Sequence, residues 1–248
     1  MPPAEPSSSS GLTVLMPAFN EGASLARSVA QVVDYLSAKR FDYEILIVDD
    51  ASTDDTALVA QGLCAANPCV RLVRHEHNQG PCSGLRTGPA HASKPWLLLL
   101  PVDLAIPLND IEALWSAREG CDVVLGYIAE QQAREPARRL QSKVYTLLVN
   151  ALFGLALEQV NYVALYRTEL LRGLPLTTSG VALHAEILVR AARAGGVIRQ
   201  CGVGYEPRRA GAASGSKPTV IVKTLRELLG LRISLLLGSR AEAATRRS

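Results

Sequence analysis

Short runs rich in apolar residues recur along the first hundred residues, and the segments between them carry apolar positions at helical spacing. The runs are Leu12–Pro17, Tyr43–Val48, Val70–Arg74 and Trp96–Leu100. An apolar strand with no polar alternation is typical of a parallel sheet that helices cover on both faces. We therefore predict a doubly wound α/β fold with a Rossmann-like, mostly parallel sheet, in which Trp96–Leu100 lies near the centre.

The same rhythm of strands and helices continues through the second half of the chain. Strands are expected at Asp122–Gly126, Val160–Arg167 and Val197–Val203. Helices are expected at Ala23–Leu36, from the polar stretch 52–55 to about Ala66, within Gly80–Ala92, at Ile111–Arg118, at Val144–Phe153 after the basic segment Ala133–Lys143, and at Ala185–Ala194. No Gly/Ser linker interrupts residues 11–210, so one large domain over residues 11–218 is expected.

Two terminal segments differ from this domain. Residues 1–10, MPPAEPSSSS, are rich in Pro and Ser and are expected to form a disordered tail. Residues 219–248 are expected to form an amphipathic helix over Thr219–Leu237 followed by a tail, and the Gly/Ser-rich stretch Arg209–Lys217 before them reads as a mobile loop.

Composition excludes several classes of protein. A net charge of +3 over 248 residues, without a basic stripe, argues against nucleic-acid binding. The five cysteines form no CxxC pair and indicate reduced thiols, and no run of eighteen apolar residues predicts a membrane span. We expect a cytoplasmic protein that can lie peripherally on the inner face of the membrane.

Polar residues gather directly after three of the predicted strands. They are Pro17–Glu21 after the first strand, Asp49-Asp50 after the second and Asp103 after the fourth. Ligands of an open parallel sheet bind beyond the carboxyl ends of its strands, so these residues predict one binding crevice. The alternative is that Pro17 and Asn20 form only a turn, while Asp49, Asp50, Ser52 and Asp54 only cap a helix.

The order of these motifs resembles the family 2 glycosyltransferases. PAFNEG, EILIVDDASTDDT, GPCSGLRTG, LLLLPVDLAIP and, in the last third, GVALHAEILVRAARAGGVIRQCGVGYEPRRAG carry the likeness over residues 11 to about 232. The branch that it resembles most is that of dolichol-phosphate mannose synthase. The resemblance implies the GT-A nucleotide-diphospho-sugar fold and an inverting transfer of a hexose from a GDP- or UDP-sugar, most often to a polyprenyl phosphate.

Site residues follow from the same resemblance. It implies that Pro17, Phe19 and Glu21 contact the nucleoside and that Val48 and Asp50 lie at its base. Val102 and Asp103 belong to the family's metal motif, in which Asp103 is the last acidic residue and would bind Mg²⁺ or Mn²⁺. Pro101 stands where the first acidic residue is usual, so we expect metal to bind only together with nucleotide.

Other family positions lie in the second half of the chain. Glu186 matches an acceptor-side glutamate, and Arg208 an arginine before the mobile loop, and both are candidate catalytic residues; Lys217 is a looser match to a nucleotide-binding lysine. Tyr127-Ile128 stands where the family often has arginine, and the polar stretch Gln159–Tyr162 is one residue short of the family pattern.

Several alternatives stay open at this stage. A phosphate acceptor needs no strong base, whereas an alcohol would need Asp103 or Glu186. The acceptor is a lipid phosphate, or else a soluble or natural-product compound, and a binding protein that has lost catalysis is the rival class. A dehydrogenase is disfavoured because no GxGxxG follows the first strand. The terminal helix lies on a membrane or packs on the domain or on a second subunit of a homodimer, and His184 is an alternative metal ligand.

Overall fold

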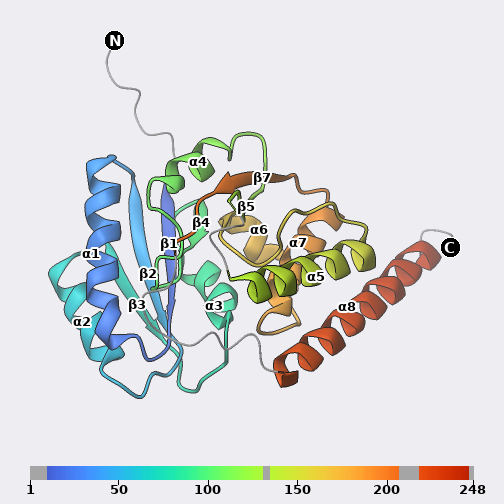
Figure 1. Ribbon diagram of the computed structural model, residues 1–248, viewed down its shortest axis with the longest axis horizontal. Helices are drawn as coiled ribbons and strands as arrows, with labels where there is room; N and C mark the ends of the chain where they lie inside the picture. The colour runs from blue at the N-terminus through green and yellow to red at the C-terminus, as the bar shows by residue number, and fades with distance from the viewer. Residues whose placement is uncertain (1–9, 131–134, 207–217, 246–248) are drawn as a thin grey trace, which may run out of the picture.

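A single seven-stranded sheet forms the centre of the molecule (Figure 1). The computed structural model describes residues 10–130, 135–206 and 218–245. The strands run in the order β3-β2-β1-β4-β6-β5-β7 across the sheet. Their bounds are β1 Leu12–Ala18, β2 Tyr43–Asp49, β3 Val70–Arg74, β4 Trp96–Leu99, β5 Val123–Ile128, β6 Ala164–Arg167 and β7 Ile198–Val203.

The sheet is parallel except at β6. β1 pairs in parallel with β2, from Leu12 opposite Tyr43, and with β4, from Leu12 opposite Trp96. β6 is antiparallel to both of its neighbours, β4 and β5, whereas β5 and β7 are parallel to each other. The predicted doubly wound, mostly parallel α/β fold is therefore confirmed, and β4 lies in the middle of the sheet as expected.

Helices cover both faces of the sheet and divide the core into two layers. The helices are α1 Gly22–Ala38, α2 Thr56–Ala66, α3 Ser83–His91, α4 Asp110–Ser116, α5 Pro136–Phe153, α6 Thr168–Gly173, α7 Ala182–Arg193 and α8 Pro218–Thr245. On one face α1, α2 and α4 pack against β1, β2 and β4. On the other face, α3, α5, α6, α7 and α8 contribute to the second core layer.

The second half departs from the expected elements in three places. α5 is one helix that begins at Pro136, because proline fits the first turn where no backbone N–H partner is needed. β6 begins only at Ala164, and the short helix α6, which the sequence did not predict, follows it directly. α8 continues beyond Leu237 to Thr245, and no helix in the described ranges is long and apolar enough to cross a membrane.

Close packing of α3 on β1 places the start of this helix beside the end of the central strand. A Cβ on Gly84 would lie 3.1 Å from Pro17 Cγ, and a Cβ on Gly88 would lie 2.7 Å from Leu15 Cδ1. Leu15 is fully buried, so it has little freedom to move aside. The two glycines therefore set the distance between α3 and the sheet.

We expect Gly88→Ala to lower the free energy of unfolding by about 1–3 kcal/mol, because the added methyl overpacks the core against Leu15. Gly62→Ala in α2 is the matched control: nothing lies within 4 Å of its Cβ position, so alanine should stabilise the helix by about 0.5–1 kcal/mol. Urea denaturation of both variants measures the difference. Equal effects of the two substitutions would contradict the packing argument.

Candidate functional site

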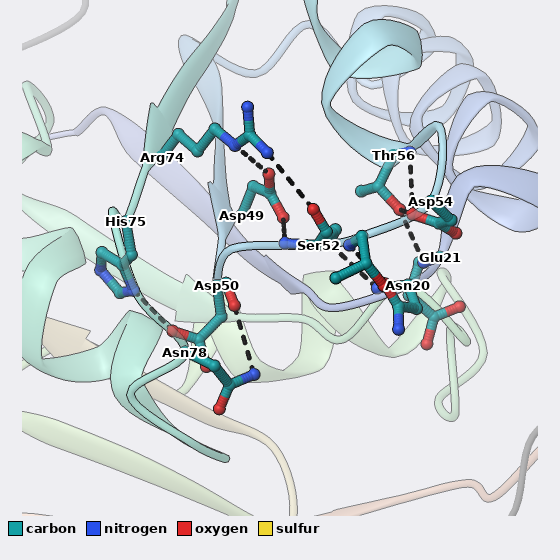
Figure 2. A network of polar contacts seen from close by, with 11 residues as sticks. Asn20, Glu21, Asp49, Asp50, Ser52, Asp54, Thr56, Arg74, His75 and Asn78 are labelled. Atoms are coloured by element: carbon teal, nitrogen blue, oxygen red, sulfur yellow. Dashed lines mark hydrogen bonds and ion pairs between the residues drawn. The ribbon is translucent and has the colours of Figure 1, made fainter.

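Loops that follow β1 and β2 meet at the carboxyl edge of the sheet and bind each other through side chains (Figure 2). Ser52 Oγ accepts the backbone N–H of Asn20 at 2.9 Å, and Thr56 Oγ1 accepts that of Glu21 at 2.8 Å. Asp54 Oδ2 accepts the N–H of Gly22 at 3.2 Å. These polar side chains satisfy the first backbone donors at the start of α1 and fix where this loop runs.

Two residues in these loops adopt the left-handed conformation that favours glycine. They are Asn20, at φ 56°, and Ala51, at φ 59°. The side chain of Asn20 accepts the N–H of Thr53 at 2.9 Å, which stabilises the turn. Asp49 accepts the N–H of Ser52 at 3.0 Å and pairs with Arg74 Nε at 3.1 Å. Asn20 thus forms a turn, Asp54 accepts the first N–H of α2 from Thr56 at 3.0 Å, and Asp49 and Ser52 hold the loops together without capping a helix.

Asp50 holds a third loop with its carboxylate. Its oxygens contact His75 Nδ1 at 2.7 Å and accept the backbone N–H groups of Gln79 and Gly80, each at 2.9 Å. His75 in turn contacts Thr87 of α3 through Nε2 at 2.8 Å. Asp50 is therefore a positioning residue for residues 78–80, and the buried contacts leave only part of its carboxylate for a ligand.

A cavity of about 580 Å³ lies beside the start of α1. It brings together Glu21, Val102 and Asp103, three of the residues that the sequence indicated. Its lining consists of Glu21, Ser24, Arg27, Ser28, Gln31, Asp34, Val102, Asp103, Leu104, Ile106, Pro107, Leu108, Asn109 and Glu206. The cavity is thus bounded by α1, by the segment after β4 and by the segment after β7.

A tight turn presents Asp103 to this cavity. Leu104 donates its N–H to the carbonyl of Pro101 at 3.0 Å and has a positive φ of 46°. Ser28 of α1 donates to the carbonyl of Val102 at 2.6 Å, while the Val102 side chain is buried. Pro101, in place of an acidic residue, therefore belongs to the backbone of the turn that positions Asp103.

The other indicated nucleoside contacts lie outside the cavity lining. Phe19 is exposed at 46%, and Pro17 packs against Gly84. The side chain of Val48 is fully buried in the core with Leu15, so a contact of Val48 with the nucleoside would be made by its backbone and stays a prediction. Sequence patterns place Val48 near the site, but strand alternation turns its side chain into the second core layer.

Glu186 lies on the opposite side of β4, in α7, and its carboxylate is fully buried. It accepts the N–H groups of Thr177 at 2.9 Å and Thr178 at 2.7 Å, both threonine hydroxyls, and Arg190 Nε at 2.7 Å. Burial raises the pKa of this carboxyl, but the hydrogen bonds from Thr178, Arg190 and Thr177 outweigh burial and lower the pKa below its usual value. The carboxylate is occupied on all sides, so the expected catalytic role of Glu186 is not supported, and we assign it the positioning of residues 177–178.

Two expected basic residues lie outside the described part of the chain, and some residues of the cavity wall were not expected from the sequence. Arg208 and Lys217 lie outside the described residues. Conversely, the sequence interpretation missed Arg27, Asp34 and Glu206 as cavity residues. A signal existed for α1, because positions 24, 27, 28, 31 and 34 form a polar stripe at helical spacing.

The donor set offers one carboxylate of the metal motif, Asp103. Among the described residues, no three His, Cys, Asp or Glu side chains form a group that could hold a metal ion. His184 does not replace the missing ligand, because it is buried in α7, and burial lowers its pKa to about 4. The residues present therefore fit a divalent ion only where a ligand's phosphates supply most of the coordination.

Comparison with known proteins decides the family. Residues 13–174, more than half of the chain, match the family model described as glycosyl transferase family 2. The chain belongs to glycosyltransferase family 2. The narrower resemblance to dolichol-phosphate mannose synthase stays a prediction.

Solved structures show the same fold at low sequence identity. Glucosyl-3-phosphoglycerate synthase from Mycobacterium tuberculosis in complex with UDP superposes with a TM-score of 0.69 at 20% identity, over 90% of this chain and 80% of that chain. Its complex with Mn²⁺, UDP-glucose and phosphoglyceric acid gives 0.66 at 19% identity, over 88% and 80%. A further mycobacterial protein gives 0.66 at 22% identity, over 88% and 74%. These likenesses confirm the GT-A fold for this glycosyltransferase.

We expect Asp50→Ala to lower the free energy of unfolding by about 1–3 kcal/mol, because His75 and the N–H groups of Gln79 and Gly80 lose their acceptor. Asp55→Ala is the matched control, since exposed Asp55 makes no side-chain cap hydrogen bond, and it should change stability by less than about 0.5 kcal/mol. Urea denaturation compares the two. A stability loss for Asp55→Ala as large as that for Asp50→Ala would remove the case for Asp50 as a positioning residue.

Glu186→Gln should lower stability at neutral pH by about 1–3 kcal/mol, because the amide cannot accept all of the donors that surround it. The folded-state pKa of Glu186 is depressed, so its contribution is complete above the unfolded pKa of about 4.3 and is lost as pH falls below it. The gap between parent and variant should therefore close in acid. Denaturation at a series of pH values tests this, with exposed Glu119→Gln as control; a gap that does not change with pH would contradict it.

Proposed function

We propose that this family 2 glycosyltransferase transfers a hexose, with inversion, from a UDP- or GDP-hexose to a polyprenyl phosphate at the cytoplasmic face of a membrane. The observation that carries the proposal is the cavity at the carboxyl edge of the sheet, which joins Glu21 to Asp103. In a sheet of this type, nucleotides bind at this edge. The complexes of similar structures with UDP and UDP-glucose favour a nucleotide-sugar donor.

The donor is held, in this proposal, between Glu21 and the turn that carries Val102 and Asp103. The carboxylate of Glu21 would accept hydrogen bonds from the nucleoside, as it now does from Ser24 Oγ at 2.7 Å. Asp103 would hold Mg²⁺ or Mn²⁺ together with the diphosphate, and the bound ion would neutralise charge on the leaving group. Phe19, which is half exposed, is available to stack on the base.

Cations beyond the described residues would complete the donor site. The described chain reaches the rim of the cavity at Glu206 and is described again from Pro218, at the start of α8. Arg208 follows Glu206 by two positions, and consecutive Cα atoms are about 3.8 Å apart. Arg208 lies outside the described residues, and its assignment to the diphosphate rests on the family resemblance and on the affinity of a guanidinium for phosphate. Lys217, also outside the described residues, is the second candidate for this contact.

A phosphate acceptor suits the residues available for proton transfer. A phosphate monoester has a second pKa near ~6, so its nucleophilic oxyanion exists at neutral pH without a base. The buried carboxylate of Glu186 is held by protein donors and takes no part in proton transfer here. The protein's contribution is then to position donor and acceptor and to stabilise the leaving diphosphate.

A soluble acceptor is the second candidate. One structure of similar fold holds phosphoglyceric acid beside UDP-glucose, which favours a small phosphorylated compound. Transfer from labelled UDP- or GDP-hexose to polyprenyl phosphate in detergent, compared with transfer to phosphoglyceric acid, separates the two acceptors. If the protein binds the donor but transfers hexose to neither acceptor, the rival hypothesis of a binding protein without catalysis is favoured and the proposal is overturned.

We expect nucleotide and Mn²⁺ to bind cooperatively, because one carboxylate alone holds the ion weakly. Calorimetry should detect no tight Mn²⁺ binding without nucleotide, and Asp103→Asn should remove most of the Mn²⁺-dependent gain in nucleotide affinity. Arg208→Ala should weaken nucleotide binding about tenfold or more, as the loss of a charge-assisted contact requires. Exposed Glu112→Gln is the control and should match the parent. Tight Mn²⁺ binding to the nucleotide-free protein would contradict this account.

A further inference from the structure

An apolar stripe runs along the exposed side of α8. Val222, Leu225, Leu229, Ile233 and Leu236 are all exposed, and Ile233 is exposed at 58%. Successive members are three or four positions apart, so at about 100° per residue they lie within about 80° of the helix circumference. Large apolar side chains in one exposed row mark an interaction surface, unlike scattered single ones.

The opposite side of α8 already packs on the protein. Thr224, Leu228 and Leu231 are buried there, and α8 contacts α7 and α5. The exposed row is therefore additional to the packing that holds α8 in place. As one of the alternatives expected, α8 packs on the domain with one face. Its other face has no partner among the described residues.

Cations border the apolar row on both of its edges. By the same helical geometry, Arg226 and then Lys223 follow one edge, and Arg232 follows the other. The acidic residue of this part of the helix, Glu227, is partly buried on the other side; it accepts a hydrogen bond from Ser179 Oγ at 2.7 Å and lies 3.9 Å from Lys223 Nζ. Over Thr219–Leu237 the exposed face of α8 thus combines an apolar row with positive edges and carries no outward carboxylate.

A second row of the same kind lies on α5, which packs against α8. Leu140, Val144 and Leu147 are exposed and stand four and three positions apart. Arg139 and Lys143 are exposed next to this row. α5 lies beside α8 (Figure 1), so two adjacent helices carry exposed apolar rows with neighbouring cations.

We propose that α8, with α5 beside it, docks this side of the protein on the surface of an anionic lipid bilayer, with the apolar rows among the acyl chains and the cations at the headgroups. An amphipathic helix with basic edges is suited to this position. A second copy of the chain fits less well, because a twofold contact would bring Arg226, Arg232 and Lys223 against like charges without exposed carboxylates from this face to pair with.

The inner side of α8, opposite the apolar row, is linked to the loop that Asp50 holds. Ser179, which binds Glu227 of α8, follows Thr177 and Thr178, the residues that Glu186 holds. Gly180 then approaches Pro81, since its Cβ position is 3.8 Å from Pro81 Cγ, beside the loop that Asp50 holds. A hollow of about 690 Å³ at the first turns of α8 is lined by Thr219, Val222, Lys223, Arg226 and Glu227.

Docking through α8 deepens the proposed function, and the link between docking and a polyprenyl acceptor rests on that function. A protein docked through α8 has residues 177–180 on the inner side of this helix, separated from the bilayer surface by about 10 Å, one helix diameter. The docking itself depends only on the exposed side chains of α8 and α5. It can therefore be tested in vesicles that contain neither substrate.

The experiment is flotation of the full chain with vesicles of phosphatidylcholine alone or mixed with phosphatidylglycerol. The parent should bind the anionic vesicles and bind neutral ones at least about tenfold more weakly, with binding reduced by salt. Leu229→Glu with Ile233→Glu should reduce binding to anionic vesicles about tenfold or more. Arg226→Gln with Arg232→Gln should reduce it about fivefold per removed charge. Leu58→Glu on α2, where Leu58 is exposed at 71% on the other face of the sheet, is the control and should bind as the parent does.

Equal binding of the α8 variants and the parent would overturn the proposal, and so would equal binding of the parent to neutral and anionic vesicles. A parent that fails to float, yet forms a dimer that Leu229→Glu with Ile233→Glu dissociates in sedimentation velocity, would assign this face to a second copy instead. Nucleotide-sugar binding is measured on every variant and should not change. If the proposed function is wrong, the parent will fail to bind nucleotide-sugar. If only the docking proposal is wrong, the parent will bind nucleotide-sugar and fail in flotation alone.

Discussion

The parallel pairing of β1 with β2 on one side and β4 on the other is the constraint on which the site depends. Parallel strands end at the same edge, so the loops after Ala18, Asp49 and Leu99 are brought together whatever their own sequences prefer. Gly84 and Gly88 then allow α3 to approach β1 closely and to carry the loop held by Asp50 to that edge. The antiparallel strand β6 separates this donor half from the half that contains α7 and α8.

Buried carboxylates perform the same structural task in both halves. Asp50 accepts the backbone N–H groups of Gln79 and Gly80, and Glu186 accepts those of Thr177 and Thr178. Each fixes a loop by accepting two of its backbone N–H groups. The two loops approach each other where Gly180 meets Pro81, so the carboxylates set the width of the crevice from opposite sides without lining the cavity beside α1 themselves.

Most of the fold could be predicted from the sequence, because strands such as Trp96–Leu99 are apolar enough to identify alone. The roles of single residues could not. Glu186 is acidic in either role, and only the positions of Thr177, Thr178 and Arg190 show that it is occupied. The motif likewise did not show that the side chain of Val48 joins the core. The α6 helix is too short, at six residues, to show a period. By contrast, Glu21 and Asp103 were indicated by motif and do share one cavity.

The charge of that cavity explains why cations from outside its described lining matter. Glu21, Asp34, Asp103 and Glu206 line it, whereas Arg27 is the one basic residue in the described lining. A diphosphate brought to this surface adds negative charge to carboxylates, which like-charge repulsion disfavours. Pro101 removes one further carboxylate that a metal site would otherwise supply, and this lessens the repulsion while weakening the hold on the ion. In the proposed function, an ion that arrives with the nucleotide would offset this repulsion, and the basic residues that follow Glu206 in the sequence would add to its effect.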